Sequence, residues 1–231
     1  MAGIDIKKGP PNQIALPFYG SPRLALTSYI CLSAGAFALV SSFWLFQTGW
    51  ITISGGFLVV TAAILYCIGT WFSFEDCPRH RLQKLFILTS AAWLVFTTLA
   101  GSMLAINLCQ PFLYRSHIHL LSLHAHAGLA GLALQLITGI SIILMPMFLL
   151  RRSERRKLLY FSCLLQNAGV AGFILDGLFN GLTTRVFIYE GLIGAGVLAW
   201  LAWLYENFRH RARKPFPASR IAAPVTAPTI P

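Results

Sequence analysis

Charged side chains are scarce in this 231-residue chain. They make up 11% of the residues, while 56% are hydrophobic, and a soluble domain carries about 25% charged residues. Water therefore cannot be the solvent for most of the surface. Acidic residues number only 7, which leaves a formal net charge of +11. The Lys and Arg residues stand in short runs between apolar stretches, a placement that argues against nucleic acid as a partner and favours anionic lipid.

Several signals of soluble or secreted proteins are also missing. The five cysteines show no CxxC spacing, and those inside apolar runs are typical of small core residues, so we predict no disulfide framework. The first 23 residues contain no apolar core followed by a small-residue cleavage site, so we predict no secretory signal. We find no nucleophile–base pair, phosphate-binding loop or nucleotide fingerprint, and nothing favours a hydrolase or an ATPase.

Long hydrophobic runs dominate the chain instead. A bilayer core of about 30 Å needs roughly 20 apolar residues in a helix, and only a helix pairs all its backbone groups within one segment. We therefore predict an all-α, six-helix transmembrane bundle, the fourth helix being long enough to tilt or to extend beyond the lipid. The predicted spans are Leu24–Phe46, Ile51–Phe74, Leu85–Leu108, Leu120–Leu150, Leu158–Leu178 and Val186–Phe208.

The basic residues predict the orientation of these spans. Of the 18 Lys and Arg residues, 16 fall in the two termini and in the second and fourth loops, and the opposite side holds only Arg115 and Arg185. By the positive-inside rule both termini are cytoplasmic, which an even number of spans allows. We predict a bacterial inner-membrane protein with a cytoplasmic segment 1–23, a transmembrane domain 24–208 and a cytoplasmic tail 209–231. The tail is rich in Pro and Ala and is expected to be disordered.

Four of the six histidines lie within ten residues at the outer end of the fourth predicted helix: His117, His119, His124 and His126. At about 100° per residue, positions seven apart share a face. His117 and His124 therefore line one face, and His119 and His126 line the nearly opposite one. Each pair is separated by about 10 Å along the axis, too far for both members to bind one small ion without help from another element.

These histidines have two interpretations. Polar side chains are tolerated where headgroups and water reach, which favours a plain interfacial helix start for His117 and His119. His124 and His126 lie one to two turns inside the apolar run, where a polar group is costly and usually functional. Imidazole is also the commonest ligand for transition metals and heme iron.

The stretch His124-Ala-His126-Ala-Gly128-Leu-Ala-Gly131, followed by Gly139 and Pro146, resembles the heme-ligand helix of the heme–copper oxidase catalytic subunit. It is most similar to the C-type oxidases and the related nitric oxide reductases. The resemblance implies that His124 is the ligand of a high-spin heme and His126 that of a low-spin heme. It covers about 25 residues, and the other five predicted helices contain no histidine. The copper site and the second low-spin ligand of the family are therefore missing, and dioxygen reduction by this chain alone is not expected.

Other side chains near the outer ends are candidates to complete a site. Met103 is a candidate second axial ligand for heme b, since His/Met ligation occurs in cytochromes, although methionine also fills cores. Asp176 and Glu190 are candidates to bind a non-heme transition metal together with the four histidines. Alternatively, the two carboxylates pair with Arg185 or Arg115 at the interface.

Three functions stay open at this point. The first is a heme b protein for electron transfer or for sensing or handling a diatomic gas, in which a homo-oligomer or a respiratory-type partner subunit supplies a further ligand. The second is a non-heme copper, zinc or iron protein of the membrane. The third is an assembly or structural subunit without a cofactor.

Overall fold

The protein is described by a computed structural model covering residues 22–73, 81–149, 156–181 and 184–209, and every regular element within these residues is helical. Six of the helical spans are long and apolar enough to cross a membrane. The all-α fold is thus confirmed for the described residues, and the six spans support a multi-pass membrane protein. The elements are α1 (Pro22–Trp44), α2 (Trp50–Ser73), α3 (Arg81–Cys109), α4 (His117–His126), the π-helix η2 (Ala127–Ala133), α5 (Leu134–Leu149), α6 (Arg156–Asn180) and α7 (Val186–Arg209).

Each predicted span coincides with an observed one to within about one helical turn. The fourth is a single continuous run made of α4, η2 and α5, and its 32-residue apolar part is about 48 Å long at 1.5 Å per residue. This exceeds the roughly 30 Å of a hydrocarbon core, as expected for a span that tilts or protrudes. The predicted ends Phe74 and Leu150, the segment 1–21 and the tail 210–231, including its expected disorder, lie outside the described residues.

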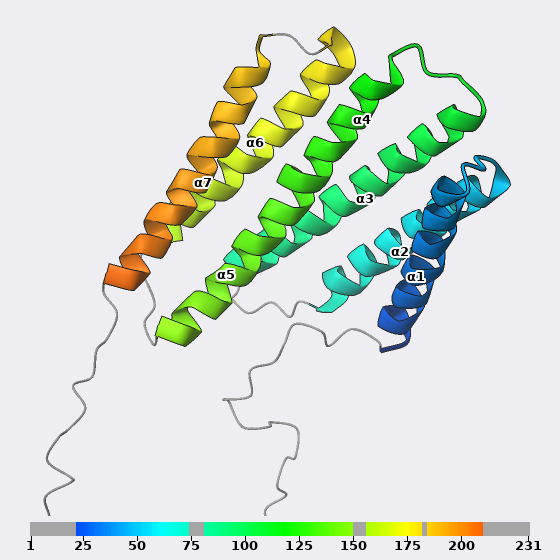
Figure 1. Cartoon of the computed structure of the whole chain (residues 1–231). Helices are drawn as coiled ribbons and strands as arrows, with labels where there is room; N and C mark the ends of the chain where they lie inside the picture. Colours follow the sequence, from blue (N-terminus) through cyan, green and yellow to red (C-terminus); the bar gives the residue numbers. More distant parts are fainter. Residues whose placement is uncertain (1–21, 74–80, 150–155, 182–183, 210–231) are drawn as a thin grey trace, which may run out of the picture.

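The helices follow one another across the bundle (Figure 1). The hairpin of α1 and α2 packs on α3, the run α4–η2–α5 packs on α3 and α6, and α7 lies against α6 and α5. The first described residue of α1 and the last of α7 are at the same end of the molecule. The α3–α4 and α6–α7 connections are at the opposite end, which we call the outer end, following the predicted topology.

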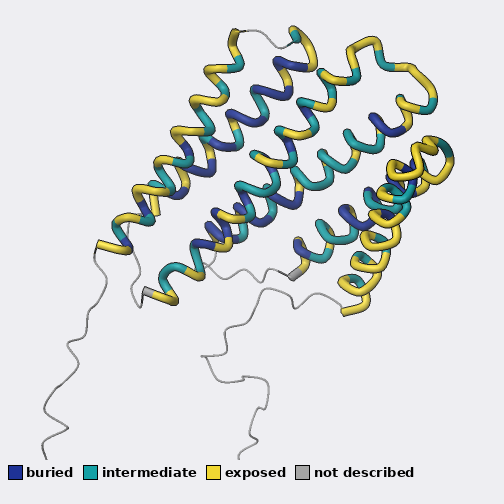
Figure 2. Tube along the Cα trace, in the orientation of Figure 1, coloured by how far each residue is buried: buried dark blue, intermediate teal, exposed yellow. Residues whose placement is uncertain are grey.

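The outward faces of α1 and α7 are almost entirely exposed (Figure 2). Large apolar side chains are among the exposed residues, including Phe37 at 76% and Leu198 at 67%. Apolar area on this scale would be very unfavourable in water, whereas hydrocarbon is its natural solvent. The exposed apolar faces therefore favour contact with a lipid bilayer.

Two apolar clusters form the interior. The inner cluster centres on Leu82, Phe86, Leu159, Cys163 and Trp203. The outer cluster centres on Leu123, Ala127, Val170, Phe173 and Ile174, from α4, η2 and α6.

Glycine brings the helices of the central bundle into close contact. A Cβ on Gly169 of α6 would lie 2.6 Å from Cγ1 of Ile193 on α7, and a Cβ on Gly196 of α7 would lie 2.7 Å from Cγ of Gln166. Other glycines of α7 have no such role, because Gly191 and Gly194 meet nothing within 4 Å. Only part of the glycine-rich pattern is therefore required for packing.

Candidate functional site

The four clustered histidines are all on α4, at the outer end of the longest span. The helix divides them between two interfaces: His119 and His126 contact α6, whereas His124 contacts α3. The predicted separation of the two faces is thus present for these three residues. His117 is the first residue of α4 and is half-buried.

The His126 ring is held in place by one hydrogen bond and one aromatic contact. Its Nδ1 lies 2.8 Å from the carbonyl oxygen of Ser122, one turn earlier in α4. Its ring packs on Phe173 of α6, with centroids 4.5 Å apart and planes 31° apart. A carbonyl oxygen only accepts hydrogen bonds, so Nδ1 of the neutral ring donates the proton and Nε2 holds the lone pair. Metal-ligating histidines commonly have this arrangement, with one nitrogen tied to a carbonyl and the other free to bind.

His119 is engaged at the outer end of α6. Its Nε2 lies 2.9 Å from the carbonyl oxygen of Gly177, and by the same reasoning Nε2 is the donor in the neutral ring. The residue therefore connects α4 to the last turns of α6. Its free lone pair is on Nδ1, next to its own backbone, a less accessible position for a ligand atom than Nε2.

His124 is pressed against the backbone of α3. A Cβ added to Gly101 would lie only 2.9 Å from Cε1 of His124, so the ring occupies the space that a side chain at Gly101 would need. The Nδ1 atom is buried and has no hydrogen-bond partner among the described residues. The α3 backbone at Gly101 therefore lies directly beside the His124 ring.

Met103 is not brought next to the histidines. It is 55% exposed on α3, two residues after Gly101, the position that contacts His124. Residues two apart on a helix point about 200° apart, so Met103 faces away from α4. Its side chain therefore lies on the exposed surface of the described helices.

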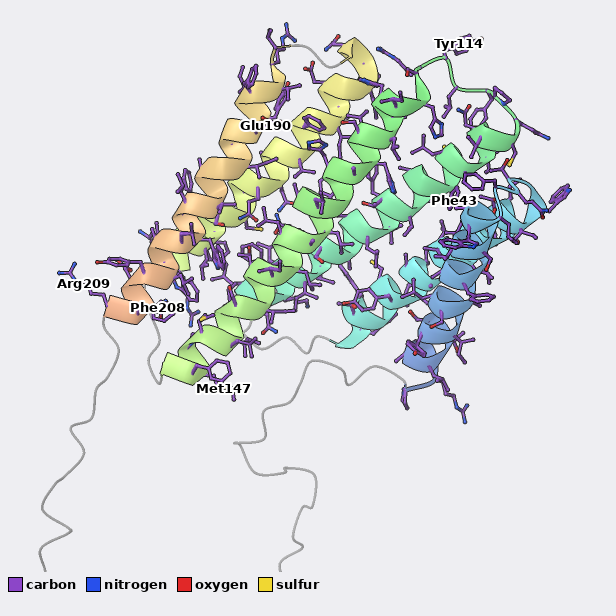
Figure 3. All side chains as sticks on the ribbon, viewed as in Figure 1. Phe43, Tyr114, Met147, Glu190, Phe208 and Arg209 are labelled. Atoms are coloured by element: carbon purple, nitrogen blue, oxygen red, sulfur yellow. The ribbon has the colours of Figure 1, made fainter. Side chains whose placement is uncertain are left out.

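The two acidic candidates have other contacts or surroundings. Asp176 is 3.8 Å from Arg185 in an ion pair, and its Oδ1 accepts a 2.7 Å hydrogen bond from Asn180. This is the interfacial pairing that the sequence leaves open for Asp176. Glu190 is exposed on α7, at the outer end of the bundle (Figure 3). Within the described ranges, no three His, Cys, Asp or Glu side chains gather in a way that could hold a metal ion.

Arg115 occupies the end of α6. It donates a 2.8 Å hydrogen bond from Nη2 to the carbonyl oxygen of Phe179, and its Nη1 lies beside Gly181, which has φ +83. A cation at this position satisfies a free carbonyl and complements the helix dipole. Both basic residues predicted for the outer side, Arg115 and Arg185, thus stabilise one helix end.

The Asp176–Arg185 ion pair is a reference point for how deep the His126 ring lies along the span. Phe173 precedes Asp176 by three residues on α6, so the ring of His126 lies about 5 Å deeper in the span than the charged pair. It is therefore inside the apolar part of the bundle but close to its outer boundary. That depth suits a cofactor within reach of the outer aqueous phase.

Two contacts of the site residues were not found by sequence reasoning: the Phe173 ring beside His126 and the Gly101 backbone beside His124. A bond of 2.8 Å from Nε1 of Trp93 to Oδ1 of Asn167 links α3 to α6 nearby. The π-helix η2 directly after His126 was also missed. π-Helical turns occur often at functional sites, but nothing in the pattern Ala127–Ala133 distinguishes one from an α-helix.

Comparisons with protein-family models, with curated proteins and with solved structures find no match to this chain. The functional argument therefore depends on the geometry of the site.

Proposed function

We propose that this chain is a heme b-binding integral membrane protein of the bacterial inner membrane, with both termini in the cytoplasm and a role in handling or sensing a diatomic gas or in electron transfer. The positive-inside distribution of Lys and Arg supports the orientation. The heme proposal extends the resemblance of the histidine helix to the heme–copper oxidase family.

One observation carries the proposal. His126 lies in the outer part of the span with Nδ1 held 2.8 Å from the Ser122 carbonyl, which leaves Nε2 as an oriented lone pair next to an aromatic ring. This is a suitable axial ligand for heme iron. His124 is less suitable, because the α3 backbone at Gly101 fills the space beside its ring.

The ligand set favours the gas-binding branch of the proposal. Of the residues the structure describes, His126 alone combines an oriented Nε2 lone pair with a place inside the span, since His119 is bonded to Gly177 and Met103 faces outward. A heme held by one histidine keeps a coordination position for a small ligand, as in globins. Bis-histidine ligation suited to electron transfer would need a second copy of the chain or a partner subunit.

The non-heme metal alternative receives less support. Asp176 is engaged by Arg185 and Asn180, and Glu190 is exposed on α7. Among the described residues, neither carboxylate joins the histidines in a group that could hold a metal ion.

The test is an optical spectrum of the detergent-purified protein, expressed with heme available and recorded oxidised, reduced, and reduced under carbon monoxide. We expect a Soret band that shifts with carbon monoxide. His126→Ala should lose the band and recover it with added imidazole. His119→Ala is the matched control, since it removes a histidine from the same helix face and should keep the band.

Two results would count against the proposal. A flat wild-type spectrum would exclude a stable heme, and metal analysis would then address the non-heme alternative. A full Soret band in His126→Ala, with loss in His124→Ala, would transfer the ligand role to the α3 face.

A further inference from the structure

A set of polar side chains crosses the middle of the bundle between the two apolar clusters. Gln135 and Thr138 on α5 and Ser162 and Gln166 on α6 are each 0% exposed. We call these four residues the polar layer.

The neighbours of these residues show that they share a depth. Trp93 of α3 packs on Gly131 and donates to Asn167, so Gly131 and Asn167 lie at one level. Gln135 is one turn inward of Gly131, and Gln166 directly precedes Asn167, so the two glutamines differ by about one turn in depth. Helical side chains lean toward the N-terminus. On these antiparallel helices Gln135 leans outward and Gln166 inward, toward the same level.

The hydrogen bonds of the polar layer are incomplete. Thr138 donates to the carbonyl oxygen of Leu134 at 2.8 Å, and Gln166 donates through Nε2 to Oγ of Ser162 at 3.1 Å. Oε1 of Gln166 and both Nε2 and Oε1 of Gln135 are buried with no partner among the described residues. Two acceptors and one donor are thus unpaired at mid-span, where each costs several kcal/mol in the absence of a partner.

The chemistry of the layer restricts what can occupy it. The runs 116–150 and 158–175 contain no Asp, Glu, Lys or Arg, so the surroundings favour a neutral occupant over an ion. The occupant must both donate and accept hydrogen bonds. Trp93 packed on Gly131 closes the layer on the outer side, and the inner cluster with fully buried Phe86 closes it on the other, so the occupant is small.

We propose that the polar layer binds internal water, with at least one molecule hydrogen-bonded to the Gln135 carboxamide, both of whose polar atoms are unpaired among the described residues. A buried water makes about three hydrogen bonds to otherwise unsatisfied groups, and it is neutral, a donor and an acceptor. The site is independent of the proposed heme ligand, because His126 faces α6 about two turns further out along the same span.

The deciding measurement is a crystal structure of the full chain grown from a lipid mesophase, at a resolution that shows ordered water. We expect density within hydrogen-bonding distance of the Gln135 carboxamide. Density there supports the site. Its absence, or a direct bond between Gln135 and another side chain, overturns it.

Thermal unfolding in detergent provides a second measurement. If a water molecule is hydrogen-bonded to the Gln135 carboxamide, Gln135→Met removes these hydrogen bonds. The variant should then lower Tm by about 2–4 °C, the shift expected for a loss of about 1 kcal/mol in unfolding free energy for a protein of this size. If the carboxamide is unpaired, the same variant removes a penalty and should raise Tm, which would contradict the proposal. Gln110→Met, at an exposed position after α3, controls for the substitution itself.

Discussion

Gly131→Ala tests the link between α3 and α6. A Cβ at this position would lie 2.7 Å from Cγ and 2.8 Å from Cδ2 of Trp93, whereas carbon atoms prefer separations of about 3.5–4.0 Å. The indole ring must therefore retreat by about 0.8 Å or more. The Nε1–Oδ1 bond from Trp93 to Asn167 is 2.8 Å long, and a retreat of this size along the bond takes it to about 3.6 Å, beyond hydrogen-bond range.

The expected loss combines two effects. An interhelical hydrogen bond in a membrane is worth about 0.6–2 kcal/mol, and overpacking a close contact costs about 1–3 kcal/mol. A total of about 1.6–5 kcal/mol corresponds to a Tm lower by about 3–20 °C for a chain of this length. The assay is thermal unfolding of the detergent-purified variant, followed by circular dichroism at the helical bands.

The control is the same substitution where space is open. Gly191→Ala on α7 meets nothing within 4 Å, and alanine favours a helix over glycine by about 0.5–1 kcal/mol, so its Tm should stay equal or rise. Equal behaviour of Gly131→Ala and Gly191→Ala would refute the reasoning. Trp93→Leu adds a double-mutant cycle: once the indole is gone, Gly131→Ala should cost little.

Three further substitutions have defined outcomes. Gly101→Leu collides with the His124 ring, since even a Cβ would lie 2.9 Å from Cε1; it should lower Tm yet keep the Soret band, because the proposed ligand His126 is on the other face. Arg185→Gln should change Tm by less than about 4 °C, because the Arg185 side chain is 65% exposed, so that the pair is worth at most about 1 kcal/mol, and Asn180 still donates to Asp176. Added salt should reduce the difference. Gly169→Ala should lower Tm more than Gly131→Ala, because one atom it meets is a backbone oxygen at 2.8 Å, which cannot rotate away.

The membrane spans were predictable because they depend on composition and length alone. Six runs of about 20 apolar residues require six helices in a bilayer, and their ends are set by charged or turn-forming residues that the sequence displays. The two faces of the histidine helix were predictable for a similar reason. Local helical geometry fixes the angle between His124 and His126 whatever surrounds them.

Which neighbour each face meets was not predictable. In a soluble helix the polar stripe reveals the side that faces out, but these spans are apolar all round and give no such signal. The rotation of α3 about its axis, which points Gly101 at His124 and Met103 at the exposed surface, results from small-residue packing that pattern analysis does not resolve.

The spacing of His124 and His126 has a chemical consequence. Residues two apart on a helix point about 200° apart, so the rings of His124 and His126 lie in separate interfaces. The two rings therefore cannot bind one ion together or lie on one face of a macrocycle. On the α3 side the ring meets a backbone that only glycine allows so close. On the α6 side the ring meets Phe173 and has its tautomer set by Ser122. Heme, if bound by this chain as proposed, should therefore depend on one histidine of the pair, and single substitutions of the two should give opposite spectra.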